Sequence, residues 1–177
     1  MNHVALLERA VAYTLGCLRT ATPAALARPT PCHDWTLREL LEHLIDSLTA
    51  LREAAEDGHV PLTPTTDPPQ DPITATRDQA RRLLGAWTTQ NGREITIGGC
   101  PLTTDIVARA GALEVAVHGW DIARACGDPR PLPQALADEL YPLALLLISD
   151  ADRPQRFAAP VEPRTPADRL LAYLGRR

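Results

Sequence analysis

The sequence predicts an all-α protein, on three observations. Apolar residues recur at three- and four-residue steps through several long segments, which is the spacing of amphipathic helices. Signals for helix starts and stops flank these segments. Aromatic residues make up only 4% of the 177 residues, so the core must consist of Leu, Ala, Val and Ile, and this favours closely packed helices over a sheet sandwich. The length fits one domain over residues 1–177, with a core of its own.

The first two helices are marked by different signals. Over about residues 3–20, Val4, Leu7 and Val11 begin a regular apolar stripe. The second helix begins at a capping box, in which the Thr36 hydroxyl and the Glu39 carboxylate each accept from the other residue's backbone N–H. It is expected to run to about residue 57, where a glycine follows as a stop signal.

His43 lies at the edge of the apolar stripe of this second helix. It is in line with Ser47, Ala50 and Ala54, which are all small. Because small side chains let a neighbouring helix approach closely, we expect His43 to face a partner helix rather than open solvent.

The rest of the chain continues the helical pattern after a proline-rich linker over residues 58–72. This linker has too many prolines for a helix and no strand alternation, and it is long enough to cross the end of a bundle. The later elements expected, in chain order, are a helix from the Asp71 cap to about residue 89, a short extended piece (94–98), a helix (103–127), a helix (134–151), a strand-like or irregular segment (157–163) and a short last helix (165–175).

The composition excludes several classes of function. Every basic residue is arginine, so a phosphate-loop lysine, a Schiff-base lysine and a pyridoxal-phosphate anchor are impossible. There is no G-x-G-x-x-G motif, and a net charge of −4 without a basic tract argues against a nucleic-acid partner. The N-terminus lacks the layout of a signal peptide, and no apolar run is long enough to cross a bilayer. We therefore expect a cytoplasmic protein without membrane or nucleic-acid partners.

Glu114 and His118 are the residues around which chemistry is expected. They are four residues apart on the predicted 103–127 helix, so they project from one face, one turn apart, and Gly111 keeps that face small. A carboxylate and an imidazole in this setting either pair with each other or bind something. We favour a divalent metal ion with His43 as the third ligand; the alternative is an ordinary ion pair on a solvated face.

Two motifs carry a resemblance to a known family. Pro29-Thr30-Pro31-Cys32-x-Asp34-Trp35-Thr36-x-x-x-Leu40-x-x-His43 is followed by Glu114-x-x-x-His118-Gly119-Trp120-Asp121. In this order they resemble the DinB / mycothiol-dependent maleylpyruvate isomerase superfamily, and more narrowly its short actinobacterial metal-binding branch. The ending, Phe157-Ala158-Ala159-Pro160-Val161 with Asp168-Arg169-Leu170-Leu171-x-x-x-Gly175-Arg176, is similar to the same branch, so the resemblance covers nearly the whole chain.

The resemblance implies a fold and a metal site. The fold is a DinB-like four-helix bundle with a long crossover, over about residues 3–151, followed by a short C-terminal helical extension over 152–177. The metal ligands carry over to His43, Glu114 and His118. Two histidines and one carboxylate leave coordination positions open, as a catalytic metal requires. We expect zinc first, with nickel, iron or manganese as alternatives.

The resemblance also implies chemistry on a low-molecular-weight thiol. The protein would be a metal-dependent thiol S-transferase or a thiol-assisted isomerase, with mycothiol as a possible co-substrate and a small electrophile as substrate. Arg109 or Arg124 would hold an anionic group of that substrate, and Asp121 would either orient a ligand histidine or pair with Arg124. Two alternatives stay open: metal binding without turnover, as a sensor or ligand-binding module, and Lewis-acid catalysis without a thiol. A monomer or a homodimer is expected.

Overall fold

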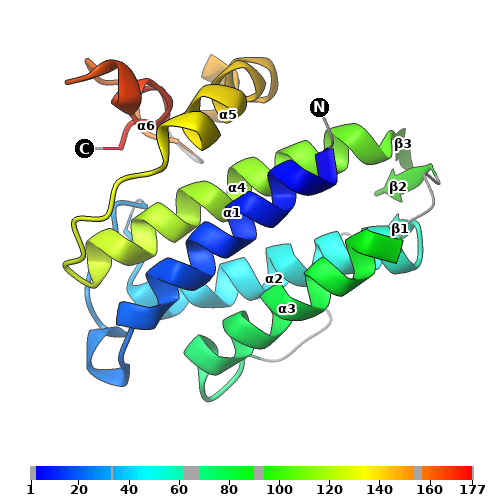
Figure 1. Ribbon diagram of the computed structural model, residues 1–177, viewed down its shortest axis with the longest axis horizontal. Helices are drawn as coiled ribbons and strands as arrows, with labels where there is room; N and C mark the ends of the chain where they lie inside the picture. Colours follow the sequence, from blue (N-terminus) through cyan, green and yellow to red (C-terminus); the bar gives the residue numbers. More distant parts are fainter. Residues whose placement is uncertain (1–2, 33, 62–67, 90–93, 154–156, 177) are drawn as a thin grey trace.

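Four long helices form a bundle, and two further helices lie across one side of it (Figure 1). The structure is a computed structural model that describes residues 3–32, 34–61, 68–89, 94–153 and 157–176. The bundle consists of α1 (His3–Cys17), α2 (Leu37–Glu56), α3 (Pro72–Thr89) and α4 (Thr104–Ala125); α5 (Gln134–Leu147) and α6 (Arg169–Tyr173) follow it. The prediction of an all-α fold built on a four-helix bundle is confirmed.

The helices of the bundle form two pairs with opposite directions. α1 and α4 run the same way and pack along their lengths, while α2 and α3 run the opposite way (Figure 1). Because α2 and α3 are consecutive and parallel, the chain between them must return along the bundle, which is the long crossover expected from the sequence. Residues 62–67 of this connection lie outside the described part of the chain.

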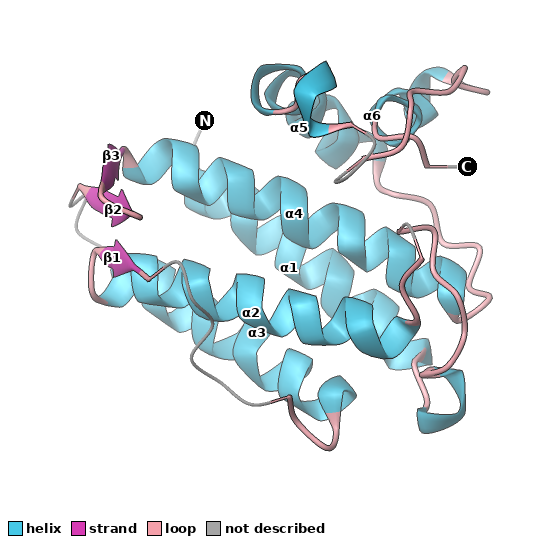
Figure 2. Cartoon of the chain, turned by 180° about the vertical axis from the view of Figure 1, so that it is seen from behind, coloured by secondary structure: helices cyan, strands magenta, loops and turns pink. Residues whose placement is uncertain are grey.

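α4 is the central element of the fold. α1 and α2 pack against it from the bundle side, and α5 covers it from the other side (Figure 2). The sequence indicated a single core stripe, but residues around the whole circumference of α4 are buried, among them Val107, Ala108, Ala112, Val115, Ala116, Ile122 and Ala123. The single stripe predicted too little burial for α4, because α5 covers a face that a four-helix bundle alone would leave exposed to solvent.

Two glycines of α4 allow the close helix contacts around it. A Cβ atom on Gly119 would lie 2.3 Å from Oγ1 of Thr14 in α1, and one on Gly111 would lie 2.5 Å from Cδ2 of Leu51 in α2. At the first contact, the Thr14 hydroxyl donates to the carbonyl of Val115 at 2.7 Å. A larger side chain at position 119 would press on the backbone of α1, because the new Cβ atom would also lie 3.0 Å from Cα of Thr14, whereas one at position 111 would first displace the Leu51 side chain.

The helix ends carry the signals that the sequence indicated. The Thr36 hydroxyl accepts from the N–H of Glu39 at 3.4 Å, and the Glu39 carboxylate accepts from the N–H of Thr36 at 2.8 Å, so the capping box is confirmed. Asp71 caps α3 by accepting from the N–H groups of Ile73 and Thr74, both at 3.1 Å. These caps fix where α2 and α3 begin.

A small sheet closes the end of the bundle that lies far from α6 (Figure 2). It consists of β1 (His59–Val60), β2 (Ile95–Ile97) and β3 (Cys100–Leu102), with β1 parallel to β2 and β2 antiparallel to β3. β2 confirms the extended piece expected over residues 94–98. The linker prediction without a strand was wrong at its start, because a two-residue strand such as β1 is too short to show alternation.

The C-terminal layer, which comprises α5, α6 and the segments that connect and follow them, differs from the prediction at the end of α5. α5 ends at Leu147 rather than near residue 151, because the N–H and hydroxyl of Ser149 donate to the Asp152 carboxylate and begin a separate 3₁₀ turn over Asp150–Asp152. Residues 157–163 are irregular, which is one of the two forms expected for this segment. No helix in the described part of the chain is both long enough and apolar enough to span a bilayer.

Candidate metal centre

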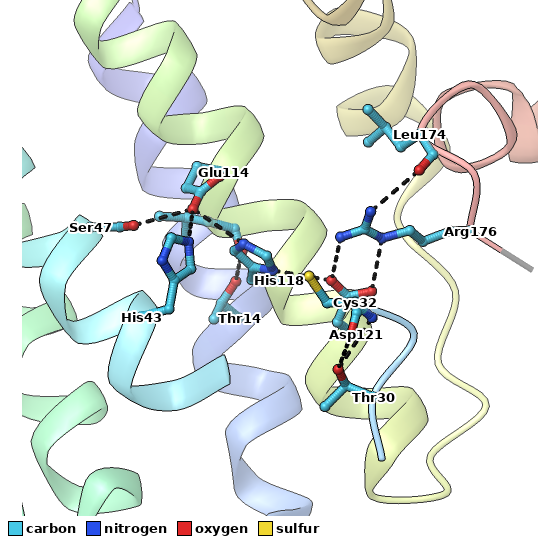
Figure 3. Close-up of polar contacts among 11 residues, drawn as sticks. Thr14, Thr30, Cys32, His43, Ser47, Glu114, His118, Asp121, Leu174 and Arg176 are labelled. Atoms are coloured by element: carbon cyan, nitrogen blue, oxygen red, sulfur yellow. Dashed lines mark hydrogen bonds and ion pairs between the residues drawn. The ribbon is translucent and has the colours of Figure 1, made fainter. Parts of the chain in front are cut away.

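Three side chains from two helices meet at one point of the bundle, His43 from α2 and Glu114 and His118 from α4 (Figure 3). Oε1 of Glu114 lies 2.7 Å from Nε2 of His43 and 3.2 Å from Nε2 of His118. One ligand atom from each of the three residues lies within 4.8 Å of the other two. The structure therefore brings together the three residues that the sequence proposed as ligands.

The surroundings of these residues hold them in place. Ser47, one turn after His43, donates from its hydroxyl to Oε1 of Glu114 at 3.1 Å. The ring of Trp35, just before the capping box, lies with its centroid 4.8 Å from that of His43. The loop before α2 therefore forms one wall of the site, and the small residue next to His43 supplies a hydrogen bond as well as space.

His118 is oriented from behind by a buried carboxylate. Its Nδ1 lies 3.1 Å from Oδ2 of Asp121, which is itself fully buried. Burial would raise the pKa of Asp121, but the hydrogen bond to His118 and the charge of Arg176 lower it, so the carboxylate is ionised. An ionised carboxylate only accepts hydrogen bonds, so Nδ1 of His118 carries the hydrogen and Nε2 faces Glu114.

Arg176 completes this arrangement from the C-terminal end of the chain. Its Nε donates to Oδ1 of Asp121 at 3.2 Å and its Nη2 donates to Oδ2 at 3.0 Å, which is a bidentate pair (Figure 3). The sequence reasoning did not propose Arg176 as a site residue. The only available signal was its place at the end of the C-terminal motif, directly after Gly175.

The charges fix the protonation of the site when no ion is bound. Burial alone would lower the pKa of His118, but the charge of Glu114 and the hydrogen bond to Asp121 outweigh it and raise this pKa to about 9. Burial would raise the pKa of Glu114, yet the two imidazoles hold it well below its usual value. At neutral pH the ion-free site therefore contains a carboxylate beside a protonated His118.

Two pockets lie between α4 and the C-terminal layer. The first, of about 200 Å³, reaches Glu114 and His118 and has mostly apolar walls. These walls are Ala110, Leu113, Val117, Leu147, Ile148, Phe157 and Leu174. The second, of about 540 Å³, lies further along α4 beside Trp120 and Arg124, and Arg176 lines both pockets. A small molecule in the first pocket would therefore meet two of the three candidate ligands, Glu114 and His118.

Comparison with known proteins places this arrangement in a family. Residues 7–123 match the model of the mycothiol maleylpyruvate isomerase N-terminal domain. The chain belongs to this family. Residues 7–123 include both sequence motifs, so all three candidate metal ligands of this chain lie within its mycothiol maleylpyruvate isomerase N-terminal domain.

Relatives and solved structures are consistent with this assignment. Two uncharacterised proteins of Mycobacterium tuberculosis, MT0763 of strain CDC 1551 / Oshkosh and Rv0738 of strain H37Rv, are each 30% identical over 161 residues, covering 85% of this chain and 85% of their own. The crystal structure of the mycothiol-dependent maleylpyruvate isomerase superposes with a TM-score of 0.60 at 16% identity. A histidine-to-alanine mutant of that isomerase gives 0.55. The match covers 77% of this chain but only 65% of the isomerase, and at this identity it supports the fold alone.

The donor set of this family member fits a divalent ion. Nitrogen and oxygen ligands at about 2.0–2.1 Å from a tetrahedral ion lie about 3.3 Å apart. The separation of 3.2 Å between Glu114 and His118 is close to this value, and the separation of 2.7 Å between Glu114 and His43 needs a shift of about half an ångström. The contact from Asp121 to His118 is the kind that orients a ligand histidine.

The other residues singled out from the sequence lie in different surroundings. Asp121 contacts His118 and Arg176, while the guanidinium of Arg124 lies over the Trp120 ring, 4.9 Å from its centroid. Arg109 pairs with Asp105 at 2.8 Å and lines neither of the two pockets. Of the two arginines proposed for a substrate anion, only Arg124 therefore borders a pocket.

Cys32 is a further neighbour of the site. Its sulfur and atoms of His118 and Asp121 lie within 4.8 Å of one another. Burial raises the pKa of this thiol to about 11, so it stays protonated at neutral pH and is a poor nucleophile. We therefore assign Cys32 a packing role over the Asp121 carboxylate.

Proposed function

We propose that this protein is a divalent-metal-dependent enzyme that uses a low-molecular-weight thiol, with mycothiol as co-substrate, to transfer the thiol to a small electrophile or to isomerise that electrophile. The observation that carries the proposal is the convergence of His43, Glu114 and His118 beside a pocket. Membership of the mycothiol maleylpyruvate isomerase family supports the thiol. Zinc is the preferred ion, and nickel, iron and manganese fit the same donors.

The exposure of the ligands supports an open site. The side chains of His43 and Glu114 are 38% and 34% exposed, while that of His118 is 7% exposed. An ion held by these three residues has coordination positions left on the exposed side. A divalent ion in such a site lowers the pKa of a bound thiol, so that the thiolate forms at neutral pH.

The protein's own residues would handle the electrophile. The apolar walls of the smaller pocket, which include Leu113, Phe157 and Leu174, exclude water from a molecule placed next to the ligands. Arg124, in the larger pocket, is the candidate for an anionic group of the substrate. Its contact with Trp120 holds the guanidinium in one orientation, which favours binding of a planar carboxylate.

The first experiment tests the metal. Protein purified without chelator or nickel resin is subjected to elemental analysis, together with the variants His43→Ala and His59→Ala. His59 is an exposed histidine in β1, so its variant is a matched control. We expect one metal ion per chain in the parent and in His59→Ala, and little in His43→Ala. Equal metal content in all three proteins would refute the assigned ligands.

The second experiment tests the chemistry. The metal-loaded parent is incubated with a panel of small electrophiles, including unsaturated carboxylic acids. Each incubation is run in the presence and in the absence of mycothiol. Product that requires both metal and thiol is the expected result. Stoichiometric metal without any product would favour a sensor or ligand-binding module, and product without thiol would favour Lewis-acid catalysis.

A further inference from the structure

The turn that follows α6 contacts the metal centre through one side chain. Arg176 is buried, and its guanidinium binds both oxygens of Asp121. Oδ2 of Asp121 is shared between this arginine and Nδ1 of His118. A line of hydrogen-bonded contacts from Arg176 through Asp121 to His118 therefore links the C-terminal segment to the candidate ligands (Figure 3).

We propose that Arg176 is a positioning residue of the metal centre, and that docking of the C-terminal segment, residues 170–176, is thereby coupled to metal binding. This inference rests on the metal site of the proposed function. It adds to that function a residue from a part of the chain that lies outside the matched family domain, residues 7–123.

The geometry explains how Arg176 acts through Asp121. Two donors of one planar guanidinium fix the plane of the carboxylate, and this aims Oδ2 at the Nδ1–H of His118. The imidazole is thereby held with Nε2 facing Glu114, which is the orientation that a metal ligand needs. A lysine would supply the charge but not two donors in a fixed plane.

The local backbone is built to deliver this side chain. The N–H of Gly175 donates to the carbonyl of Ala172 and the N–H of Arg176 donates to that of Leu171, which is the Schellman pattern at the end of a helix. Gly175 has φ of 73°, and a Cβ atom there would lie 2.7 Å from Cβ of Ala158. Only glycine fits both the turn and the close packing at position 175. This glycine therefore allows the backbone to bring Arg176 to Asp121.

Coupling of this kind works in both directions. If docking of residues 170–176 aligns His118 for the ion, then the bound ion must stabilise the docked segment by the same free energy. Metal should therefore slow hydrogen exchange in this segment, although the segment itself supplies no ligand.

The test compares three variants with the parent. Arg176→Met removes the bidentate pair while keeping much of the side-chain bulk, and Arg176→Lys keeps only the charge. Tyr173→Phe is the matched control, because the Tyr173 hydroxyl holds the same segment by donating to the carbonyl of Ile148 at 2.7 Å and does not touch Asp121. Zinc affinity is measured by competition with a chelator, and the site geometry is read from the visible spectrum of the Co²⁺-loaded protein.

We expect Arg176→Met to bind zinc about 10–100-fold more weakly than the parent and to change the Co²⁺ spectrum, with Arg176→Lys showing a smaller loss in the same direction. Tyr173→Phe should keep the affinity and spectrum of the parent. Zinc should slow hydrogen exchange over residues 170–176 in the parent and in Tyr173→Phe, but not in Arg176→Met.

The outcomes separate this inference from the proposed function. A parent that binds neither zinc nor Co²⁺ would overturn both. A parent that binds zinc, with a folded Arg176→Met variant of equal affinity and unchanged spectrum, would overturn the inference and leave the proposed function standing. If Arg176→Met does not fold, Arg176→Lys decides, and parent-like affinity and spectrum in that variant would refute the positioning role.

Discussion

Zinc binding should become about 50-fold tighter between pH 7 and 9. In the ion-free protein the pKa of His118 is raised to about 9, so Nε2 is almost fully protonated at pH 7 and about half protonated at pH 9. Zinc needs the lone pair of Nε2 and must displace that proton, so one proton leaves for each ion bound. This loss of the proton corresponds to about 50-fold in affinity, close to tenfold over the first pH unit and less over the second, whereas a histidine with an ordinary pKa of about 6.5 would give a plateau above pH 7.

The raised pKa of His118 has the opposite effect on the stability of the ion-free fold, which decreases as the pH rises. A pKa that is raised on folding contributes stability that is fully present below the unfolded value of 6.5 and is lost as the pH rises through about 9. From pH 6.5 to 9, the His118 contribution to stability therefore falls in the chelated protein, while the stabilisation by zinc increases.

Competition titrations against a chelator of known pH dependence, from pH 6.5 to 9.5, measure the affinity. Calorimetry in buffers with different ionisation enthalpies counts the protons released. The lowered pKa of Glu114 means that this carboxylate has no proton to lose in the range. A zinc affinity that levels off near pH 7, or zinc binding at pH 8 without proton release, would refute the assignment of a protonated His118 beside Glu114.

Three further predictions concern stability, each measured as a thermal midpoint. Gly119→Ala places a Cβ atom 3.0 Å from the Thr14 backbone and should cost about 2 kcal/mol, lowering the midpoint by about 4–8 °C, whereas Gly85→Ala, with nothing within 4 Å of the new atom, should raise it by about 1–4 °C; the reverse order would contradict the packing described for α4. Thr36→Ala removes the capping box and should cost about 1 kcal/mol, or about 2–4 °C, and an unchanged midpoint would mean that the cap does not stabilise α2. A strong chelator should lower the midpoint of metal-loaded protein by about 5–11 °C when free metal was at about 100 times its dissociation constant. The His43→Ala variant is the reference, and its midpoint should not change when the chelator is added.

Local signals made much of the bundle predictable. The capping box at Thr36 and Glu39 and the cap at Asp71 depend only on residues within one helical turn, so their spacing in the sequence fixes their geometry. The four-residue step from Glu114 to His118 is a property of any helix. His43 could be added because its small-residue flank indicated a close helix contact.

Features set by contacts between distant segments could not be predicted in this way. Arg176 meets Asp121 across 55 residues, and the direction of its side chain depends on how α6 packs on α5 and how α5 packs on α4. The burial of α4 on all sides depends on α5, which sequence periodicity places in the chain but not in space. β1 is two residues long, which is too short for any pattern.

The two sides of the smaller pocket come from different parts of the fold. The residues that would hold an ion are fixed by the interior of the bundle, while Leu147, Ile148 and Phe157 in the opposite wall belong to the C-terminal layer. Under the proposed function, substitutions in that wall would change which electrophile enters, while His43, Glu114 and His118 stay on the bundle helices that carry them. Phe157 is the first position to vary in an attempt to redirect this protein to a larger molecule.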